Sequence, residues 1–300
     1  FAAHQNMESI ASSATSLLIG FIAGNTSSIR VGSGGVMLPN HAPLIIAEQF
    51  GTLESLYPGR IDLGLGRAPG TDQMTSFALR RNLNGSVDDF PQDVIELRNY
   101  LAPHSASARV RAIPGEGTQV PIWLLGSSTY SAQLAAALGL PVAFSSQFAP
   151  EQLQEALRLY RERFTPSDQW QQPYSMACIN VIAADTDEEA DYLASSFYKL
   201  ASGIVTNLRK PLQPPSKNFL KEWDEYEKAA VLQMMKYTFI GSQATVKKGL
   251  VSFLDDTQVD EIMIASYIYD NEAKIHSYEL VGELFKKENK EEKITALQIG

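Results

Sequence analysis

The sequence is poor in the residues that build disulfide frameworks and metal sites. Cys178 is the only cysteine among 300 residues, so no disulfide can form within the chain. No spaced set of Cys and His residues is typical of structural zinc. This cysteine usage favours a reducing compartment, and we predict a cytoplasmic protein in which Cys178 is a small core residue.

Positive charge is also scarce. The 25 Lys and Arg residues stand against 34 Asp and Glu residues, which gives a net charge of -9. Nucleic acids and anionic membrane surfaces attract proteins with an excess of Lys and Arg, so this balance disfavours both kinds of partner. An anionic ligand would have to be held by a local group of donors.

Long apolar runs and the short motifs of several common enzyme classes are missing. The apolar stretch at residues 10–23 is interrupted by hydroxyl side chains and by Gly20, so it is too short and too polar to span a membrane. It also lacks the basic leader of a signal peptide. The sequence has no HExxH zinc motif, no GxxxxGK phosphate loop and no nucleophile elbow. These absences argue against zinc proteases, P-loop nucleotidases and α/β-hydrolases.

The chain contains instead a regular alternation of predicted strands and helices. Alternating or continuous apolar residues predict strands at residues 28–38, 60–66, 121–125, 142–146, 174–183 and 260–266, after the end of another strand at residues 1–3. Helical spacing predicts helices at residues 8–24, 43–56, 72–83, 90–101, 130–138, 151–164, 185–202, 225–237, 242–254 and 272–291. Because composition does not change along the chain, this alternation favours one (β/α)8 TIM barrel over a Rossmann sheet.

The predicted barrel is a single domain spanning residues 1–300 with three irregular parts. Pro and Gly residues predict an insertion at about residues 103–120 and a mobile loop at about residues 203–224. Charged residues predict a frayed tail at about residues 289–300. A closed barrel needs eight strands, so we expect the first strand, the first helix and most of the second strand to precede Phe1 in a longer translated protein.

The stretch at residues 60–70, RIDLGLGRAPG, passes from an alternating strand into glycines and an arginine. Arg67 therefore follows the carboxyl end of a strand, where ligands bind in parallel α/β proteins. A guanidinium has five fixed donors that suit a phosphate or a carboxylate. Glycines can equally serve close packing of strands and helices, and both interpretations of this stretch remain open.

Two other predicted strands end in unusual residues on the same edge. Ser33-Gly34-Gly35 interrupts one strand, and Gly126-Ser127-Ser128 with Ser131 leads from another strand into a helix. Free N–H groups at a helix start and nearby hydroxyls favour an anion, although a simple helix cap explains Ser127 or Ser128 equally well. His4 ends the first strand remnant, where an imidazole can act as an acid or base or can only pack.

Three segments together resemble the bacterial luciferase-like, flavin-dependent monooxygenases, particularly the single-chain branch of luciferase-like monooxygenases. They are residues 31–72, 123–141 and 260–270, which contain VGSGGVMLPN, GRIDLGLGRAPGTD, WLLGSSTYSAQ and DEIMIASYIYD. The resemblance covers residues 1–288. It implies a (β/α)8 barrel that binds reduced flavin mononucleotide, FMN, at the carboxyl ends of the strands and consumes oxygen and a small organic substrate.

The resemblance also implies roles for single residues. Arg67 matches the arginine that contacts the flavin phosphate, and the phosphate-binding turn corresponds to Gly126, Ser127, Ser128 and Ser131. Gly34 and Gly35 match a site where the family often has a non-prolyl cis peptide beside the flavin ring. His4 matches the first histidine of the family's Glu-His-His motif, which reads Ala3-His4-Gln5 here, and is the candidate catalytic acid or base. No metal ligands are implied.

These observations lead to one main expectation and two alternatives. The main expectation is an FMN-dependent monooxygenase that receives reduced FMN from a separate flavin reductase and forms a homodimer through helices near residues 8 and 43. Residues 203–224 would shield its site from water. A deazaflavin-dependent oxidoreductase of the same superfamily is the first alternative, and a non-catalytic flavin-binding protein is the second.

Overall fold

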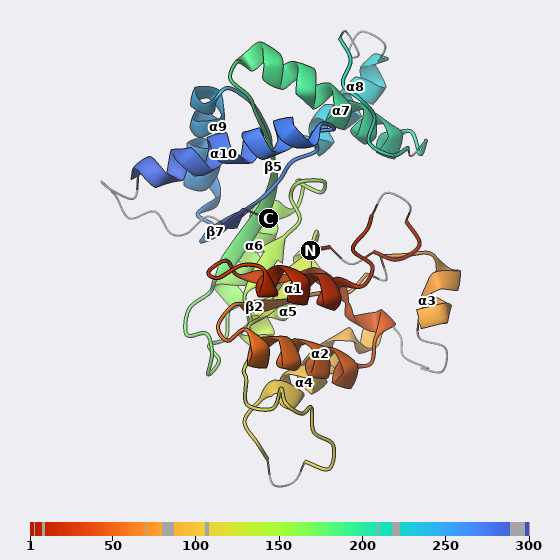
Figure 1. Ribbon diagram of the computed structural model, residues 1–300, viewed down its shortest axis with the longest axis vertical. Coiled ribbons are helices and arrows are strands. Elements are labelled where there is room, and N and C mark those ends of the chain that lie inside the picture. The colour runs from red at the N-terminus through yellow and green to blue at the C-terminus, as the bar shows by residue number, and fades with distance from the viewer. Residues whose placement is uncertain are drawn as a thin grey trace. The chain divides into compact units, whose positions relative to one another are not determined.

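The computed structural model describes residues 1–2, 4–7, 10–68, 70–79, 87–105, 108–208, 210–217, 223–288 and 298–299 (Figure 1). These residues form two compact units. The first unit contains Phe1–Gly126, Tyr130–Val142 and Arg163–Pro173, and the second contains Ser127–Thr129, Ala143–Glu162 and the chain from Tyr174 onward. Each unit is described by itself. The expected single domain over residues 1–300 stays a prediction.

The first unit is built on three parallel strands. β1 (Val31–Met37) pairs with β2 (Ile61–Gly66), and β2 pairs with β3 (Ile122–Gly126). All three strands are mostly buried, as expected for parallel strands in an α/β fold. Phe1 lies beside β1, because its terminal nitrogen donates to Gly32 O and its carbonyl accepts from Gly34 N. These two bonds have the pattern of a parallel ladder at Phe1, but residues 1 and 2 form no strand and residue 3 of the predicted remnant lies outside the described residues, so the remnant stays a prediction.

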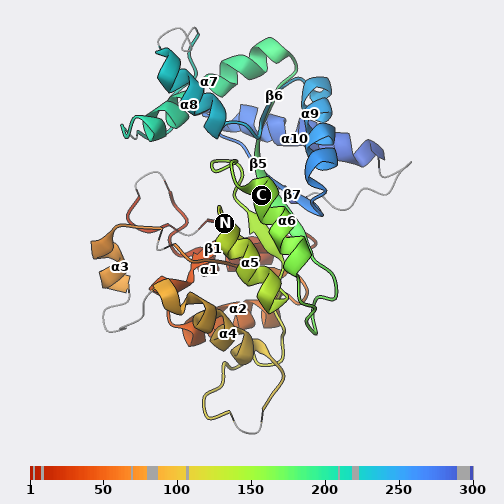
Figure 2. The same ribbon diagram turned by 180° about the vertical axis from the view of Figure 1, so that it is seen from behind.

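The helices of the first unit follow the predicted order. They are α1 (Thr15–Gly24), α2 (Pro43–Leu56), α3 (Gln73–Leu79), α4 (Phe90–Leu101) and most of α5 (Thr129–Leu138), with 3-10 turns η1 (Leu38–Asn40) and η2 (Val87–Asp89). α2 packs against both α1 and α4, and the three helices lie together in both views (Figure 1, Figure 2). Phe50 and Leu97 are fully buried at this packing layer.

Strands β1 and β2 approach each other unusually closely near Ser33 and Gly64. The Ser33 hydroxyl donates to Gly64 O at 2.9 Å and accepts from Gly64 N at 3.0 Å. A Cβ atom on Gly64 would lie 2.1 Å from Ser33 O, so only glycine fits there. The register between the strands shifts between Ser33 and Val36. The glycines of both motifs therefore serve strand packing as well as any ligand.

The second unit is also an α/β structure. β5 (Ser175–Ala183) pairs in parallel with β6 (Thr238–Gly241) and β7 (Glu261–Ala265), and β7 pairs with β8 (Gln298–Ile299). Its remaining elements are β4 (Val142–Phe144), α6 (Leu153–Arg163), α7 (Asp187–Val205), α8 (Glu225–Met234), α9 (Gln243–Thr257) and α10 (Asn271–Glu288). α7 and α9 pack on β6, and α10 packs on β5 (Figure 2). Phe197 of α7, Val231 of α8 and Ile268 belong to one buried core cluster that also contains Ile182 of β5.

Several predicted boundaries are wrong. The first helix begins at Thr15, not near residue 8, because the preceding serines bond elsewhere: the Ser12 hydroxyl donates to Ala2 O. β6 was not predicted, since its four residues TFIG carry no recognisable alternation. The helix predicted to begin at residue 185 begins at Asp187, after the cap Thr186, whose hydroxyl accepts from Glu189 N at 3.1 Å.

The three irregular parts are only partly within the described residues. The segment predicted as an insertion is tied to the end of α4, because Gly117 N and Gln119 N both donate to Leu101 O. Helix α7 continues to Val205 and so takes the first residues of the predicted 203–224 loop. Residues 289–297 and 300 of the predicted frayed tail lie outside the described residues, and residues 298–299 form β8.

Candidate functional site

Arg67 lies at the common carboxyl edge of the three strands of the first unit. β2 ends at Gly66, which pairs with Met37 at the end of β1 and with Leu125 near the end of β3. The next residue, Arg67, therefore leaves the sheet at the edge where α/β proteins bind ligands. This confirms the position predicted for Arg67.

The Arg67 guanidinium rests on an aromatic ring of the next helix. Its Cζ atom lies 4.0 Å from the centre of the Tyr130 ring, within the range of a cation–π contact. Tyr130 is the second residue of α5. Within the described ranges, Arg67 has no hydrogen bond or ion pair to a carboxylate, and its side chain is half-buried. The donors of the guanidinium are therefore available to a ligand.

Ser131 adds a hydroxyl beside the end of β3. The residue is only 6 % exposed, and no residue in the described part of the chain hydrogen-bonds to its hydroxyl. A Cβ atom on Gly126 would lie 2.2 Å from Ser131 Oγ and 2.4 Å from its Cβ, so the strand end contacts the first turn of α5 directly. The structure thus places Arg67 against Tyr130 and Gly126 against Ser131, the next residue of α5. The sequence predicted that Arg67, Gly126 and Ser131 would lie at one edge, but it did not point to Tyr130.

Ser127 and Ser128 occupy the turn between β3 and α5. Both serines belong to the second unit. In the same unit, the first N–H of α5, on Thr129, donates to the side-chain oxygen of Gln152 at 3.1 Å. Gln152 immediately precedes α6, and nothing in its local sequence marks it as a cap for another helix. Sequence reasoning missed it for that reason.

The expected non-prolyl cis peptide is present between Gly34 and Gly35 in β1. A Cβ atom on Gly35 would lie 2.8 Å from Gly64 O and 3.1 Å from Leu125, so packing alone requires glycine there. At Gly34 the nearest atom would be 4.0 Å away. Gly34 is therefore the position of the pair where a Cβ atom would meet no close contact.

His4 lies against the loop that follows Arg67. Its Nδ1 atom is 3.0 Å from Gly70 O. A carbonyl oxygen only accepts hydrogen bonds, so Nδ1 is the donor in this bond and Nε2 is the ring nitrogen that does not face Gly70 O. Thr71 donates to Gln5 O at 3.1 Å, and Asn6 donates to Asp72 at 3.0 Å. Residues 4–6 are thus tied to residues 70–72, which places His4 in the same unit as Arg67 and Ser131.

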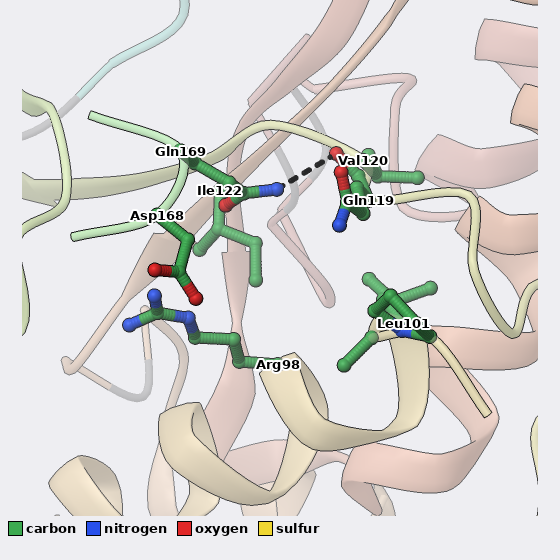
Figure 3. A pocket seen from close by; sticks show the side chains of 9 residues that line it. Arg98, Leu101, Gln119, Val120, Ile122, Asp168 and Gln169 are labelled. Atoms are coloured by element: carbon green, nitrogen blue, oxygen red, sulfur yellow. Dashed lines mark hydrogen bonds between the residues drawn. The ribbon is translucent and has the colours of Figure 1, made fainter. Parts of the chain in front are cut away.

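Neither of two pockets contains a predicted site residue. Figure 3 shows the smaller one, of about 90 Å³, at the amino end of β3 and thus at the opposite end of this strand from Gly126. It is lined by residues that include Arg98, Leu101, Gln119, Ile122, Asp168 and Gln169, and Gln169 donates to Gln119 O (Figure 3). Pockets that bury a cofactor usually exceed about 300 Å³. The pocket in Figure 3 is too small for one.

The larger pocket belongs to the second unit and has a volume of about 480 Å³. It lies between the end of α7 and the segment after it, where Lys199 donates to Pro214 O at 2.6 Å. Its size is within the range of small-molecule sites.

Two further findings concern the described residues as a group. None of their helices combines the length and the apolar character that crossing a membrane requires. In the same residues, no cluster of three or more His, Cys, Asp or Glu side chains has the arrangement of a metal site.

Comparison with known proteins decides the family. The sequence model described as luciferase-like monooxygenase matches residues 1–261. The chain belongs to the luciferase-like monooxygenase family. Its fold class is accordingly the α/β fold of the luciferase-like TIM barrels, as predicted.

Among its relatives, a luciferase-like monooxygenase of Escherichia coli (strain K12) is 52% identical over 279 residues, covering 93% of this chain and 83% of the relative. YvbT of Bacillus subtilis (strain 168) is 53% identical over 286 residues, covering 95% and 85%. The crystal structure of apo-MsnO8 is 33% identical, with a TM-score of 0.82 over 95% of this chain and 86% of that chain.

Two more distant structures with a similar fold and one further relative carry descriptions that name different cofactors and substrates. The FMN complex of the oxygenating constituent of 3,6-diketocamphane monooxygenase is 17% identical, with a TM-score of 0.61 over 93% of this chain and 85% of that chain. An F420-dependent secondary alcohol dehydrogenase is 16% identical, with a TM-score of 0.64 over 93% and 87%. N-acetyl-S-alkylcysteine monooxygenase of Bacillus subtilis (strain 168) is 37% identical over 63% of this chain and 58% of the relative.

Proposed function

We propose that this protein binds reduced FMN at the carboxyl edge of β1, β2 and β3 and uses oxygen to oxidise a small organic substrate. The observation that carries the proposal is the presence of Arg67 and Ser131 at this edge. Among the described residues, the half-buried Arg67 guanidinium has no carboxylate partner, and the Ser131 hydroxyl in the first turn of the adjacent helix has no hydrogen-bond partner. The phosphate of FMN would supply the acceptor that both groups lack.

The chain's own residues would bind and orient the cofactor. Arg67 and Ser131 hold its phosphate, with Gly126, Ser127 and Ser128 forming the turn that leads into α5. Gly34 and Gly35 let the backbone of β1 approach a flat ring. When bound, reduced FMN supplies the electrons that activate oxygen. The Nε2 atom of His4, the ring nitrogen that does not face Gly70 O, would accept a proton during the reaction.

The decisive measurement is a titration with FMN followed by fluorescence. We expect Arg67→Ala to weaken binding by roughly 10- to 100-fold, because a charge-assisted hydrogen bond contributes about 1.5–3 kcal/mol. Arg98→Ala is the matched control, since Arg98 is also half-buried in the first unit but lines the pocket in Figure 3 at the other end of β3. No FMN binding below millimolar concentration, or equal binding by Arg67→Ala, would contradict the proposal.

A deazaflavin is the alternative cofactor, favoured by the F420-dependent structural neighbour. Titrating the protein with FMN and F420 under the same conditions separates the two possibilities. Tighter binding of F420, with hydride transfer from an alcohol and no oxygen uptake, would assign the deazaflavin reaction.

The substrate class is tested with a separate flavin reductase that supplies reduced FMN. Oxygen consumption above the reductase background is then measured with a panel of aldehydes, alkanes and N-acetyl-S-alkylcysteines, the last chosen from the name of a relative. Substrate-dependent oxygen uptake supports a monooxygenase. FMN binding without turnover of any member would favour the second alternative, a non-catalytic flavin-binding protein.

A further inference from the structure

We propose that Tyr130 is a positioning residue that holds the guanidinium of Arg67 in place for the phosphate of the cofactor. The inference rests on the proposed function, because it assigns to Tyr130 a part in FMN binding. It follows from the contact between the Arg67 Cζ atom and the Tyr130 ring, whose centre is 4.0 Å away.

The contact explains how an arginine without any other polar partner can be ordered. Within the described part of the chain, Arg67 forms no hydrogen bond or ion pair that would fix its long side chain. Ordering such a side chain only when the ligand arrives costs conformational entropy and reduces affinity. A ring already in contact with the guanidinium removes part of that cost before the ligand binds.

The contact with Tyr130 also leaves the Arg67 guanidinium able to bind a phosphate. A planar guanidinium that contacts an aromatic face keeps its N–H donors, which lie in its own plane, free for a bidentate acceptor. An ion pair with a carboxylate would occupy the same donors and would neutralise the charge that a phosphate needs. An aromatic support is therefore better suited to an anion site than an acidic one.

Tyr130 further couples Arg67 to the other donor of the site. It is the second residue of α5 and Ser131 is the third, so both side chains belong to the same helical turn. Gly126 packs directly on Ser131, which fixes this turn against the end of β3. Tyr130 thus sets the Arg67 charge and the Ser131 hydroxyl at a constant separation.

Two other roles for Tyr130 make different predictions. Its hydroxyl could bind the phosphate directly, in which case Tyr130→Phe would lose affinity. The ring could serve only the packing of α5, in which case its loss would weaken the binding of any flavin and would not depend on Arg67.

The first experiment measures the dissociation constants of FMN and of riboflavin, which lacks the phosphate, for the wild type, Tyr130→Phe and Tyr130→Leu. We expect Tyr130→Leu to bind FMN roughly 3- to 30-fold more weakly, the range of a cation–π contact, and riboflavin as the wild type does. Tyr130→Phe keeps the ring and should retain near wild-type affinity. Equal loss in both variants, no loss in Tyr130→Leu, or equal loss for riboflavin would overturn the proposal.

A double-mutant cycle then tests whether Tyr130 acts through Arg67. In an Arg67→Ala background, Tyr130→Leu should cause no further loss of FMN affinity, because the group it positions is gone. Additive losses would overturn the proposal. If the wild type bound FMN no more tightly than riboflavin, the proposed function and this inference would both fall. If the wild type prefers FMN and Tyr130→Leu prefers it by the same factor, only this inference is contradicted.

Discussion

At the scale of single residues, the site depends on glycines that leave no room for a side chain. A Cβ atom on Gly126 would overlap Ser131 Oγ and Cβ, at 2.2 and 2.4 Å. Gly126→Ala should therefore displace the first turn of α5 and lower the free energy of unfolding by about 1–3 kcal/mol. Urea denaturation checks this expectation.

The second substitution Ser131→Gly removes both overlapping atoms and serves as the control for Gly126→Ala. We expect the double variant to regain part of the stability, although glycine inside a helix costs roughly 0.5–1 kcal/mol itself. If Gly126→Ala were as stable as the wild type, the direct contact between the strand end and α5 would be wrong.

His4 carries the proposed proton transfer, because its Nδ1 atom is engaged by Gly70 O and its Nε2 atom is not. We expect His4→Gln to slow substrate-dependent oxygen uptake by roughly 10²- to 10⁴-fold, the usual contribution of a general acid or base. The dissociation constant of FMN should not change. His104→Gln is the control, since His104 is an exposed histidine bonded to Glu116. Full activity of His4→Gln would show that His4 does not transfer a proton in the reaction.

At the scale of elements, α1 and α2 present apolar side chains to solvent. Residues 10–29 contain no charged residue, and Leu17 and Phe21 of α1 are 74% and 66% exposed. Ile45 and Leu56 of α2 are also exposed, and the two helices contact each other. Exposed apolar side chains gathered on neighbouring helices are typical of a protein–protein interface. We propose that these helices form the homodimer interface expected from the sequence.

Phe21→Asp should convert the dimer to a monomer, because it places a charge in an apolar interface. Sedimentation velocity measures the change. Met74→Asp on α3 is the control, since Met74 is an equally prominent exposed apolar residue that lies outside α1 and α2. A monomeric wild type, or the same sedimentation for Phe21→Asp and the wild type, would contradict the proposed interface.

The elements themselves were largely predictable because local pattern determines them. α2 and α4 have the predicted bounds, and β5 begins one residue later than predicted. β6 escaped prediction because its four residues become a strand only by pairing with β5. The late start of α1 also has a cause remote in sequence, the bond from Ser12 to Ala2.

At the scale of the whole molecule, charged groups in both units set the pH dependence of stability. Hydrogen bonds from Thr75 and Asn6 lower the pKa of Asp72, and those from Ser242 and Thr245 lower the pKa of Asp187. Stability from these carboxylates is present above their ordinary pKa of 3.8 and is lost as the pH falls through their lower folded values. The urea midpoint should therefore fall below about pH 4.

The contribution of His276 to stability depends on pH in the opposite direction. The hydrogen bond to Asp185 raises its pKa above the ordinary 6.5, so its contribution is present below that pH and is lost as the pH rises through the raised value. Urea midpoints measured from pH 3 to 9 should show both limbs. Asp187→Asn should reduce the loss of stability at acid pH, and His276→Gln should reduce the loss at alkaline pH. Because all these groups are exposed, raising the salt concentration should reduce both effects.

The sequence alone determined the succession of strands and helices and the motifs at strand ends. Apolar period and turn residues act over a few positions, so a reader of the sequence can place Arg67, Gly126 and Ser131 next to strand ends. Parallel strands share one carboxyl edge, which is why their proximity could also be predicted.

Only the tertiary structure decided which side chains meet at that edge. The contact of Arg67 with Tyr130, the cap on Thr129 from Gln152 and the bond of His4 to Gly70 join residues far apart in the chain. Each depends on how a loop or helix packs after the strands have paired, and local sequence carries no signal for such packing. For the same reason, only the structure showed that Gly64 serves strand contact, one of the two interpretations that the sequence had left open, and that Gly35, linked to the flavin by the resemblance, serves strand contact too.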